Sequence, residues 1–206
     1  MSIKKSLICV AIAASAFAAQ ASNLVVNGSF EQVSAGNSQA AGTWGIYSGI
    51  NGWSGAPNIE VRDNIAGAAQ SGSNYIELDT NNNSGMFQVI TGNGWYNLSF
   101  WFSARQGVAA GSNGIGFNFG NLSGQVLTAV AGAPSGNVWQ QYTGLVNLNG
   151  PTSLFFFGMG TSDSLGGSLD NVSVTAAVPE PESYAMMLAG LGLMGAIARR
   201  RKSKAA

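Results

Sequence analysis

Between residues 22 and 177 the apolar residues never keep a helical period, and this limits the possible fold more than any other feature. Short runs of β-branched and aromatic residues alternate instead with clusters of Gly, Asn and Ser, which favour tight turns. The runs predict eleven short strands, at 24–26, 43–47, 58–62, 74–78, 86–90, 96–104, 115–119, 125–130, 139–146, 153–159 and 168–175. Strands of this number and length predict an all-β fold, a two-sheet β-sandwich of the jelly-roll type.

The composition of the chain supports a packed domain and excludes several functions. Hydrophobic residues make up 46% of the chain, which favours a core over disorder, while charged residues make up only 9%. The same 22–177 segment has two cations, Arg62 and Arg105, against seven carboxylates, so no basic patch supports a nucleic-acid partner. The segment also lacks histidine and cysteine, which excludes zinc sites and catalysis that depend on these residues.

The first 21 residues have the three parts of a secretory signal peptide. Lys4 and Lys5 precede an apolar run at 7–19, and Ala19-Gln20-Ala21 forms a small-x-small cleavage site. The apolar run is shorter than the ~20 residues that a membrane-spanning helix needs. We therefore expect export through the Sec machinery and removal of residues 1–21 by signal peptidase.

The C-terminal end has a second ordered set of features. Pro179-Glu180-Pro181 precedes an uncharged segment at 184–198, and a basic cluster at 199–202 follows. A helix over the uncharged segment would reach about 22 Å, short of the ~30 Å hydrocarbon core, so we expect a short hydrophobic helix that anchors the chain in the inner membrane only temporarily.

This order of motif, apolar segment and basic cluster resembles the PEP-CTERM sorting tail of Gram-negative bacteria. The resemblance implies that the protease exosortase processes the tail near the Pro-Glu-Pro motif. It also implies delivery to the cell surface or the extracellular matrix. The chain is therefore expected to contain a signal peptide at 1–21, one β domain at 22–177 and a sorting tail at 178–206.

Several short segments of the middle domain resemble galactose-binding-like jelly rolls, especially those of carbohydrate-binding modules. The segments are 23–31 (NLVVNGSFE), 52–53 (GW), 95–101 (WYNLSFW) and 169–174 (LDNVSV). The resemblance implies a domain that binds carbohydrate, and the expected partner is the exopolysaccharide of the cell's own biofilm.

Strand alternation separates the core from a candidate sugar-binding face. In the strand at 96–104, Leu98, Phe100 and Phe102 share one face, which we expect to be the core. Trp101 lies on the opposite, polar face, where an aromatic ring can stack on a sugar while amides and charged groups bind its hydroxyls. The candidate platform consists of Trp101, Tyr75, Glu77 and Arg105.

An alternative keeps Trp101 in a second hydrophobic cluster beneath a long loop. The other tryptophans are expected in the core or under loops; they are Trp44, Trp53, Trp95 and Trp139.

The jelly-roll resemblance also implies a structural calcium ion between the opening and closing strands. Glu31 and Asp170 would each donate a carboxylate, and backbone carbonyls near Asn27 and Ser29 would complete the oxygen shell. The alternative is a pair of polar end-caps without metal. Either arrangement would stabilise the domain and take no part in catalysis.

The leading interpretation is a non-catalytic, exported surface or matrix protein that binds carbohydrate. One alternative is a structural matrix component without a defined glycan ligand. Another is a small secreted glycan-active enzyme, which would need a carboxylate pair drawn from Glu60, Glu77 and Asp79. No sequence motif supports such a pair.

Overall fold

The computed structural model describes residues 22–122, 125–127 and 131–177, together with residues 188, 190–192 and 194–195 of the tail. The predicted signal peptide and the Pro-Glu-Pro motif lie outside these residues. The described residues between 22 and 177 belong to one compact unit, and the described tail residues belong to a second. The described tail residues are helical. Within the described part of the chain, no helix is long and apolar enough to span a membrane, so transient anchoring stays a prediction.

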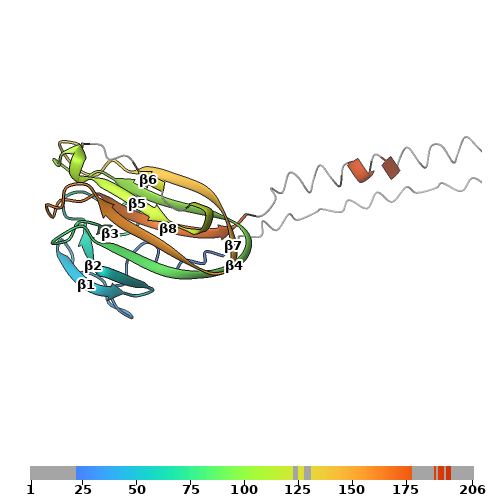
Figure 1. Ribbon diagram of the computed structural model, residues 1–206, viewed down its shortest axis with the longest axis horizontal. Coiled ribbons are helices and arrows are strands. Elements are labelled where there is room, and N and C mark those ends of the chain that lie inside the picture. Colours follow the sequence, from blue (N-terminus) through green and yellow to red (C-terminus); the bar gives the residue numbers. More distant parts are fainter. Residues whose placement is uncertain are drawn as a thin grey trace, which may run out of the picture. The chain divides into compact units, whose positions relative to one another are not determined.

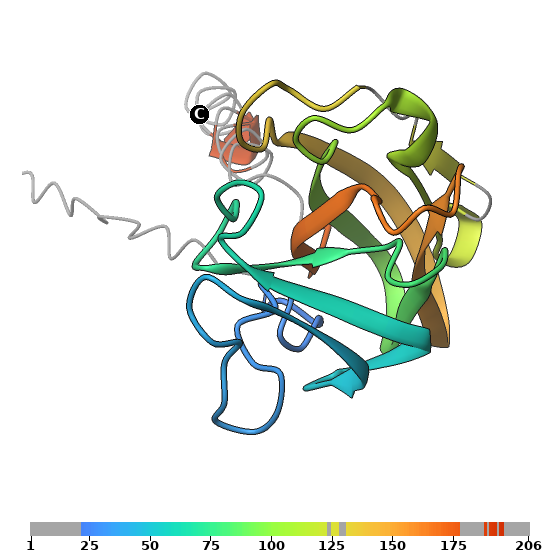
Figure 2. The same cartoon turned by 90° about the vertical axis from the view of Figure 1, so that its left-hand side faces the viewer.

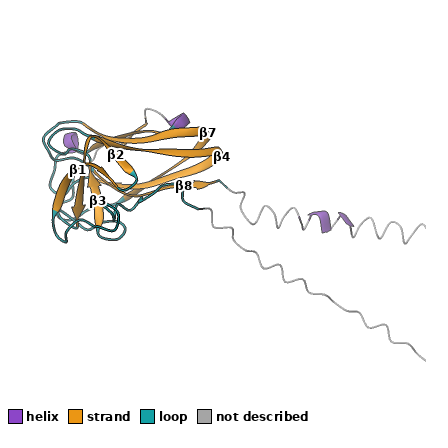
Figure 3. Cartoon of the chain, turned by 90° about the horizontal axis from the view of Figure 1, so that it is seen from below, coloured by secondary structure: helices purple, strands orange, loops and turns teal. Residues whose placement is uncertain are grey.

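Strands provide nearly all the regular structure of the compact unit (Figures 1 and 3). The described residues form eight strands and two 3₁₀ turns: β1 (Trp44–Ile50), β2 (Trp53–Asp63), β3 (Asn74–Glu77), β4 (Gly85–Ser103), η1 (Ala110–Ser112), β5 (Gly114–Asn118), η2 (Gly120–Leu122), β6 (Gln125–Leu127), β7 (Gln140–Met159) and β8 (Ser168–Ala176). The predicted all-β sandwich of the jelly-roll type is confirmed.

The strands pair in the order β1-β2-β3-β8-β4-β7-β5-β6, and every pairing is antiparallel. The first half of β2 also pairs with the start of β4, where Ser54 lies opposite Phe87. The ladder therefore closes on itself through β2, β3, β8 and β4. The long strands β4 and β7 pair over nearly their whole length, from Gly85 opposite Phe157 to Phe102 opposite Gln140 (Figure 1).

The prediction of eleven strands is wrong at three places. The predicted runs 86–90 and 96–104 belong to one strand, β4, and the runs 139–146 and 153–159 belong to β7. Gly92 lies opposite Gly150 inside a continuous ladder, and Gly94 and Gly150 adopt positive φ angles of 104° and 96°. These glycines bend the strands without ending them. The run 24–26 is no strand, although the backbone of Leu24 donates a hydrogen bond to Val174.

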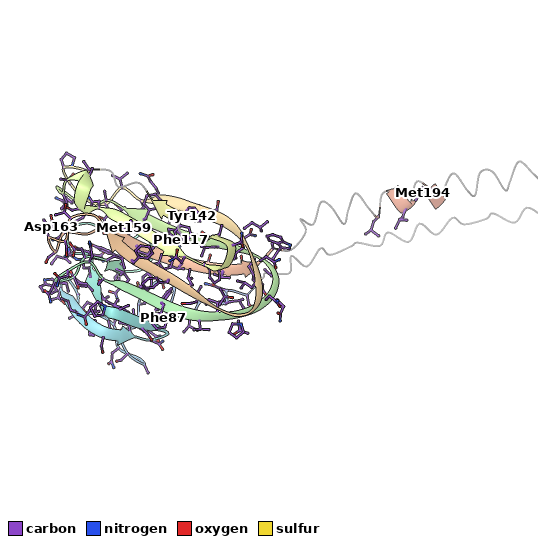
Figure 4. All side chains as sticks on the ribbon, in the orientation of Figure 1. Phe87, Phe117, Tyr142, Met159, Asp163 and Met194 are labelled. Carbon is purple, nitrogen blue, oxygen red and sulfur yellow. The ribbon has the colours of Figure 1, made fainter. Side chains whose placement is uncertain are left out.

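Aromatic rings fill much of the core. Phe100 packs against Phe117 and Phe156 with ring centroids 5.2 Å and 5.0 Å apart, and Phe156 reaches Trp53 at 6.1 Å. Figure 4 shows Phe117 beside Tyr142, whose ring centroid lies 4.8 Å away. The predicted core face of β4 is confirmed at Leu98 and Phe100, which are fully buried, while Phe102 is partly buried against the same core.

The tryptophans follow the prediction only in part. Trp53 is buried in the core, and Trp139 packs beneath a loop, where its Nε1 donates to the Ala68 carbonyl at 3.0 Å. Trp44 and Trp95 are exposed by 54% and 53%, so their predicted burial is wrong. Trp44 begins β1, which has a partner strand on one side only, and Trp95 alternates outward along β4.

Candidate functional site

Strand alternation on β2 and β3 separates apolar core residues from a polar outer face. Val61 and Ile76 are fully buried in the core, and their neighbours in sequence point the opposite way. The register places Glu60 opposite Glu77 and therefore brings two carboxylates together on the outer face.

Glu77 lies at the centre of a buried charge network. Its Oε2 is 2.6 Å from Nη2 of Arg62, and its Oε1 is 2.7 Å from Nη1 of Arg105. Arg62 also contacts Oε1 of Glu60, through Nη2 at 2.7 Å and Nε at 2.8 Å. One fully buried carboxylate thus holds both cations of the 22–177 segment in fixed positions.

Burial and charge act against each other in this network. Burial raises the pKa of the Glu77 carboxyl to about 7, although Arg62 and Arg105 favour its ionised form. Burial disfavours the charge of Arg62, but Glu77 and Glu60 outweigh this effect and raise the pKa of the guanidinium. Arg62 is therefore a permanent cation, while the charge on Glu77 depends on pH near neutrality.

The loop between β7 and β8 is tied to the same network. The Gly166 N–H donates to Oε1 of Glu77 at 2.8 Å, and Nη1 of Arg105 donates to the Ser164 carbonyl at 2.8 Å. The Asp163 N–H donates to Oδ2 of the buried Asp79, also at 2.8 Å. Figure 4 places Asp163 at one end of the sandwich, and Figure 2 views that end directly. These bonds fix the loop as one wall of a pocket.

The pocket has a volume of about 200 Å³. Its lining consists of Trp44, Ile46, Glu60, Arg62, Thr80, Asn81, Arg105 and Ser164. Trp44 is more than half exposed, so its indole presents a free aromatic surface beside the fixed guanidinium groups. The pocket therefore combines a stacking surface, hydrogen-bond donors and a carboxylate acceptor in one place.

The structure separates the four residues of the predicted sugar platform. Glu77 and Arg105 form an ion pair, but only Arg105 lines the pocket, because Glu77 lies beneath it. Tyr75 is buried, donates its hydroxyl to the Ile65 carbonyl and packs edge-on against Trp139. Trp101 is partly exposed on the outer face of β4, as alternation predicts, and is not part of the pocket lining.

Most of the pocket lining was not among the predicted site residues. A usable signal was present: the charged pair Glu60 and Arg62 alternates with buried Ile59 and Val61, and Arg62 is one of only two cations in the segment. The loop residues of the lining carried no such signal, because the approach of separate loops depends on the tertiary fold.

The predicted calcium ligands have other partners in the structure. Oε1 of Glu31 accepts the N–H groups of Ser73 and Asn74, each at 3.0 Å. Oδ2 of Asp170 accepts the N–H groups of Gln70 and Ser71, at 2.8 Å and 2.9 Å. The two carboxylates thus hold one loop, and each keeps a second oxygen with fewer partners.

Asn27 and Ser29 are not among the residues that hydrogen-bond to Glu31 or Asp170 in the described part of the chain. The Asn27 carbonyl already accepts the Phe30 N–H and Nε1 of Trp53, at 3.1 Å and 3.2 Å. Its side-chain oxygen accepts the Gln32 N–H at 3.2 Å. The described residues hold no cluster of three or more Asp, Glu, His or Cys that could bind a metal. The calcium site stays a prediction.

We expect Glu31→Ala to lower the free energy of unfolding by about 2–3 kcal/mol, because two backbone donors and the Ser73 hydroxyl lose their acceptor. Gly72 allows the close approach, since a Cβ there would lie 2.3 Å from Oε1 of Glu31. Urea unfolding in calcium and in EDTA measures the effect. If Glu31→Ala loses the same unfolding free energy in both media, Glu31 stabilises the loop without an ion. If the wild type is less stable in EDTA than in calcium, the predicted ion is supported.

Comparison with known proteins identifies the tail. Residues 177–202 match the PEP-CTERM protein-sorting motif. The chain is therefore an exported surface protein that carries the motif recognised in exosortase sorting, attached to an all-β sandwich domain.

The chain is similar to part of a much longer protein. It is 33% identical over 159 residues to the multifunctional-autoprocessing repeats-in-toxin protein of Vibrio vulnificus, a match that covers 74% of this chain and 3% of that protein. The chain thus spans about 3% of the length of this curated relative.

Among solved structures, similar chains include three carbohydrate-binding modules. TmCBM61 in complex with beta-1,4-galactotriose is 13% identical with a TM-score of 0.41, over 76% of this chain and 99% of that chain. CBM35 from Paenibacillus barcinonensis is 20% identical with a TM-score of 0.39, over 66% and 100%. A CBM4 structure is 20% identical with a TM-score of 0.41, over 73% and 98%.

Proposed function

We propose that this chain is a non-catalytic surface or matrix protein that binds carbohydrate in the pocket beside Trp44. The observation that carries the proposal is an exposed indole next to polar groups that are fixed before any ligand arrives. A sugar stacks its apolar face on such a ring, while guanidinium N–H groups donate to its hydroxyls and a carboxylate accepts from them. Arg62, Arg105 and Glu60 supply these groups.

The size and charge of the pocket support an uncharged, single-ring ligand. Its volume of about 200 Å³ is below the ~300–1,000 Å³ of sites for larger organic ligands. Two arginines are balanced by Glu60 within the pocket and Glu77 beneath it, and a sugar carboxylate would approach the charge of Glu60. A neutral sugar at a chain end or side branch fits both properties.

The positions of the carboxylates support binding over hydrolysis. Glycoside hydrolysis usually needs two carboxyl groups on either side of one bond. Both oxygens of Glu77 are turned to arginines, and Oδ2 of Asp79 holds the loop at 163–165. Among the described residues, Glu60 is the one carboxylate that lines the pocket.

The position of the pocket on the sandwich suits a surface protein. β8 starts at Ser168, opposite Glu77, and ends at Ala176, about 26 Å further along an extended strand. The sorting motif begins directly after β8. Export through Sec, cleavage by signal peptidase near residue 21 and processing by exosortase near Pro179 would leave the pocket free to meet exopolysaccharide.

We expect Trp44→Ala to weaken binding of a neutral sugar about tenfold, because the stacking surface is lost. The melting temperature should change little, since Trp44 is 54% exposed. A glycan array identifies the ligand, and calorimetry on the variant measures the change. Val89→Ala, a control on an exposed part of β4, should bind as tightly as the wild type. An array that retains no glycan favours the structural matrix interpretation, and unchanged affinity in Trp44→Ala contradicts the pocket as the site.

A further inference from the structure

We infer that the domain has a second carbohydrate-binding surface, on the outer face of β4 and β7, which takes an extended, uncharged polysaccharide. We call it the tryptophan face. It is defined by Trp95, Asn97, Ser99 and Trp101 of β4 with Gln141 and Leu145 of β7. The surface is separate from the pocket beside Trp44 and shares no lining residue with it.

The burial pattern of β4 shows which side chains face outward. Leu98 and Phe100 are fully buried in the core. Trp95 is 53% exposed, Asn97 is exposed, and Trp101 is partly exposed, as expected for the alternate positions.

The register adds β7 to the same face. Asn97 lies opposite Leu145, and Trp101 lies opposite Gln141. Leu145 is 48% exposed, and Nε2 of Gln141 donates to Oγ of Ser99 at 2.9 Å. Side chains of directly opposed residues lie on one side of a sheet, so the six residues form one continuous surface with some polar groups already held in place.

The length of the tryptophan face favours a polymer over a single sugar. Trp95 and Trp101 are six residues apart on one strand, which corresponds to about 20 Å in an extended chain. Two indoles at this separation, with amide and hydroxyl groups between them, can stack with two separate rings of one chain. A single ring would leave one of the two tryptophans unused.

The charge of the face favours a neutral polymer. None of its six residues is charged. Asp170, the cross-strand neighbour of Trp101, is fully buried and accepts backbone N–H groups of Gln70 and Ser71. The loop that contains these residues therefore covers the carboxylate and bounds the face at the Trp101 end. Because the face has no cation, it offers no electrostatic attraction to a polyanion.

A pocket for one ring and a face for a chain would let one domain hold two polysaccharide segments, and the second contact would raise the overall affinity for a polymer. The inference does not depend on the pocket, because the face can bind a polymer whether or not the pocket binds a sugar.

The test compares the full chain, in mild detergent, with the variants Trp95→Ala and Trp95→Ala/Trp101→Ala. The probes are a neutral linear glucan, a neutral linear galactan and a polyuronate of similar length, titrated by calorimetry with micelles as the blank. We expect the wild type to bind at least one neutral polymer and to bind the polyuronate more weakly. The double variant should lose about tenfold in affinity for the neutral polymer. Val89→Ala should bind as the wild type does.

Trp95→Ala keeps the test valid if the double variant fails to fold, because Trp95 has little buried surface to lose. Unchanged polymer affinity in the folded single and double variants would overturn the inference. A chain that binds no neutral polymer, or that forms a dimer which Trp95→Ala separates, would also overturn it. Trp44→Ala then distinguishes the two proposals, since it affects single-sugar binding in the pocket and not the contact with the tryptophan face.

Discussion

Replacing Arg62 with methionine is expected to lower the free energy of unfolding by about 3–5 kcal/mol. Arg62 is in contact with Glu60 and Glu77, whose side chains are 5% and 0% exposed. Methionine keeps much of the apolar stem but removes the positive charge, so two buried carboxylates lose a partner and Glu77 retains only Arg105. Urea unfolding at pH 8, where Glu77 is mostly ionised, measures the loss.

Arg105→Met is the matched control for this prediction. Its side chain is 19% exposed, against 7% for Arg62, so water screens its interactions more and the loss should be smaller. Adding Glu77→Gln to Arg62→Met should recover part of the lost stability, because the uncompensated charge is removed. If Arg62→Met lowers the free energy of unfolding by less than about 1 kcal/mol, the buried Glu77 carboxylate is not stabilised substantially by Arg62.

Lowering the pH from 8 to 5.5 is expected to make the domain more stable. Burial raises the pKa of Asp170 to about 7 from an ordinary value of 3.8, the charge of Glu31 adds to this effect, and hydrogen bonds from backbone N–H groups oppose it. Burial likewise raises the pKa of Glu77 to about 7 from 4.5. Both carboxyls are easier to bury when they carry a proton.

The direction of this change in stability follows from the number of protons bound by the folded and the unfolded state. Between about pH 4 and 7 the folded domain holds protons on Asp170 and Glu77 that the unfolded chain has released. Stability therefore rises as the pH falls through 7, levels off near 4 and is lowest above 7, with a slope of up to about 1.4 kcal/mol per pH unit for each group.

Thermal unfolding at pH 8, 7, 6 and 5.5 measures this slope. Asp170→Asn should make the slope shallower, because one of the two groups no longer titrates. Asp163→Asn is the matched control, because its carboxylate accepts the Ser112 hydroxyl at 2.8 Å and bonds neither Asp170 nor Glu77. The slope should stay the same in this variant. A domain whose melting temperature rises from pH 5.5 to 8 would contradict the prediction.

Local sequence was sufficient to predict which face of a single strand each side chain occupies. Alternation placed Leu98 and Phe100 in the core and Trp101 on the outer face, because side chains of a strand point alternately to its two sides. The same rule sets Glu60 and Arg62 apart from Ile59 and Val61. Strand ends were less predictable, since Gly92 and Gly94 suggested a turn where a continuous partner strand carries β4 onward.

The sequence by itself determined the all-β class, the sorting tail and the faces of single strands, because these depend on residues that are close along the chain. Only the tertiary structure decided which outer-face residues meet. Tyr75 and Glu77 lie on the outer face of β3, yet both are buried, Tyr75 against Ile65 and Trp139 and Glu77 beneath the loop that contains Gly166. Trp44 becomes the aromatic wall of a pocket because β1 pairs with β2 and the loop at 163–166 is tied to Glu77 and Asp79. Such contacts join residues that are up to about a hundred positions apart, and no local pattern encodes them.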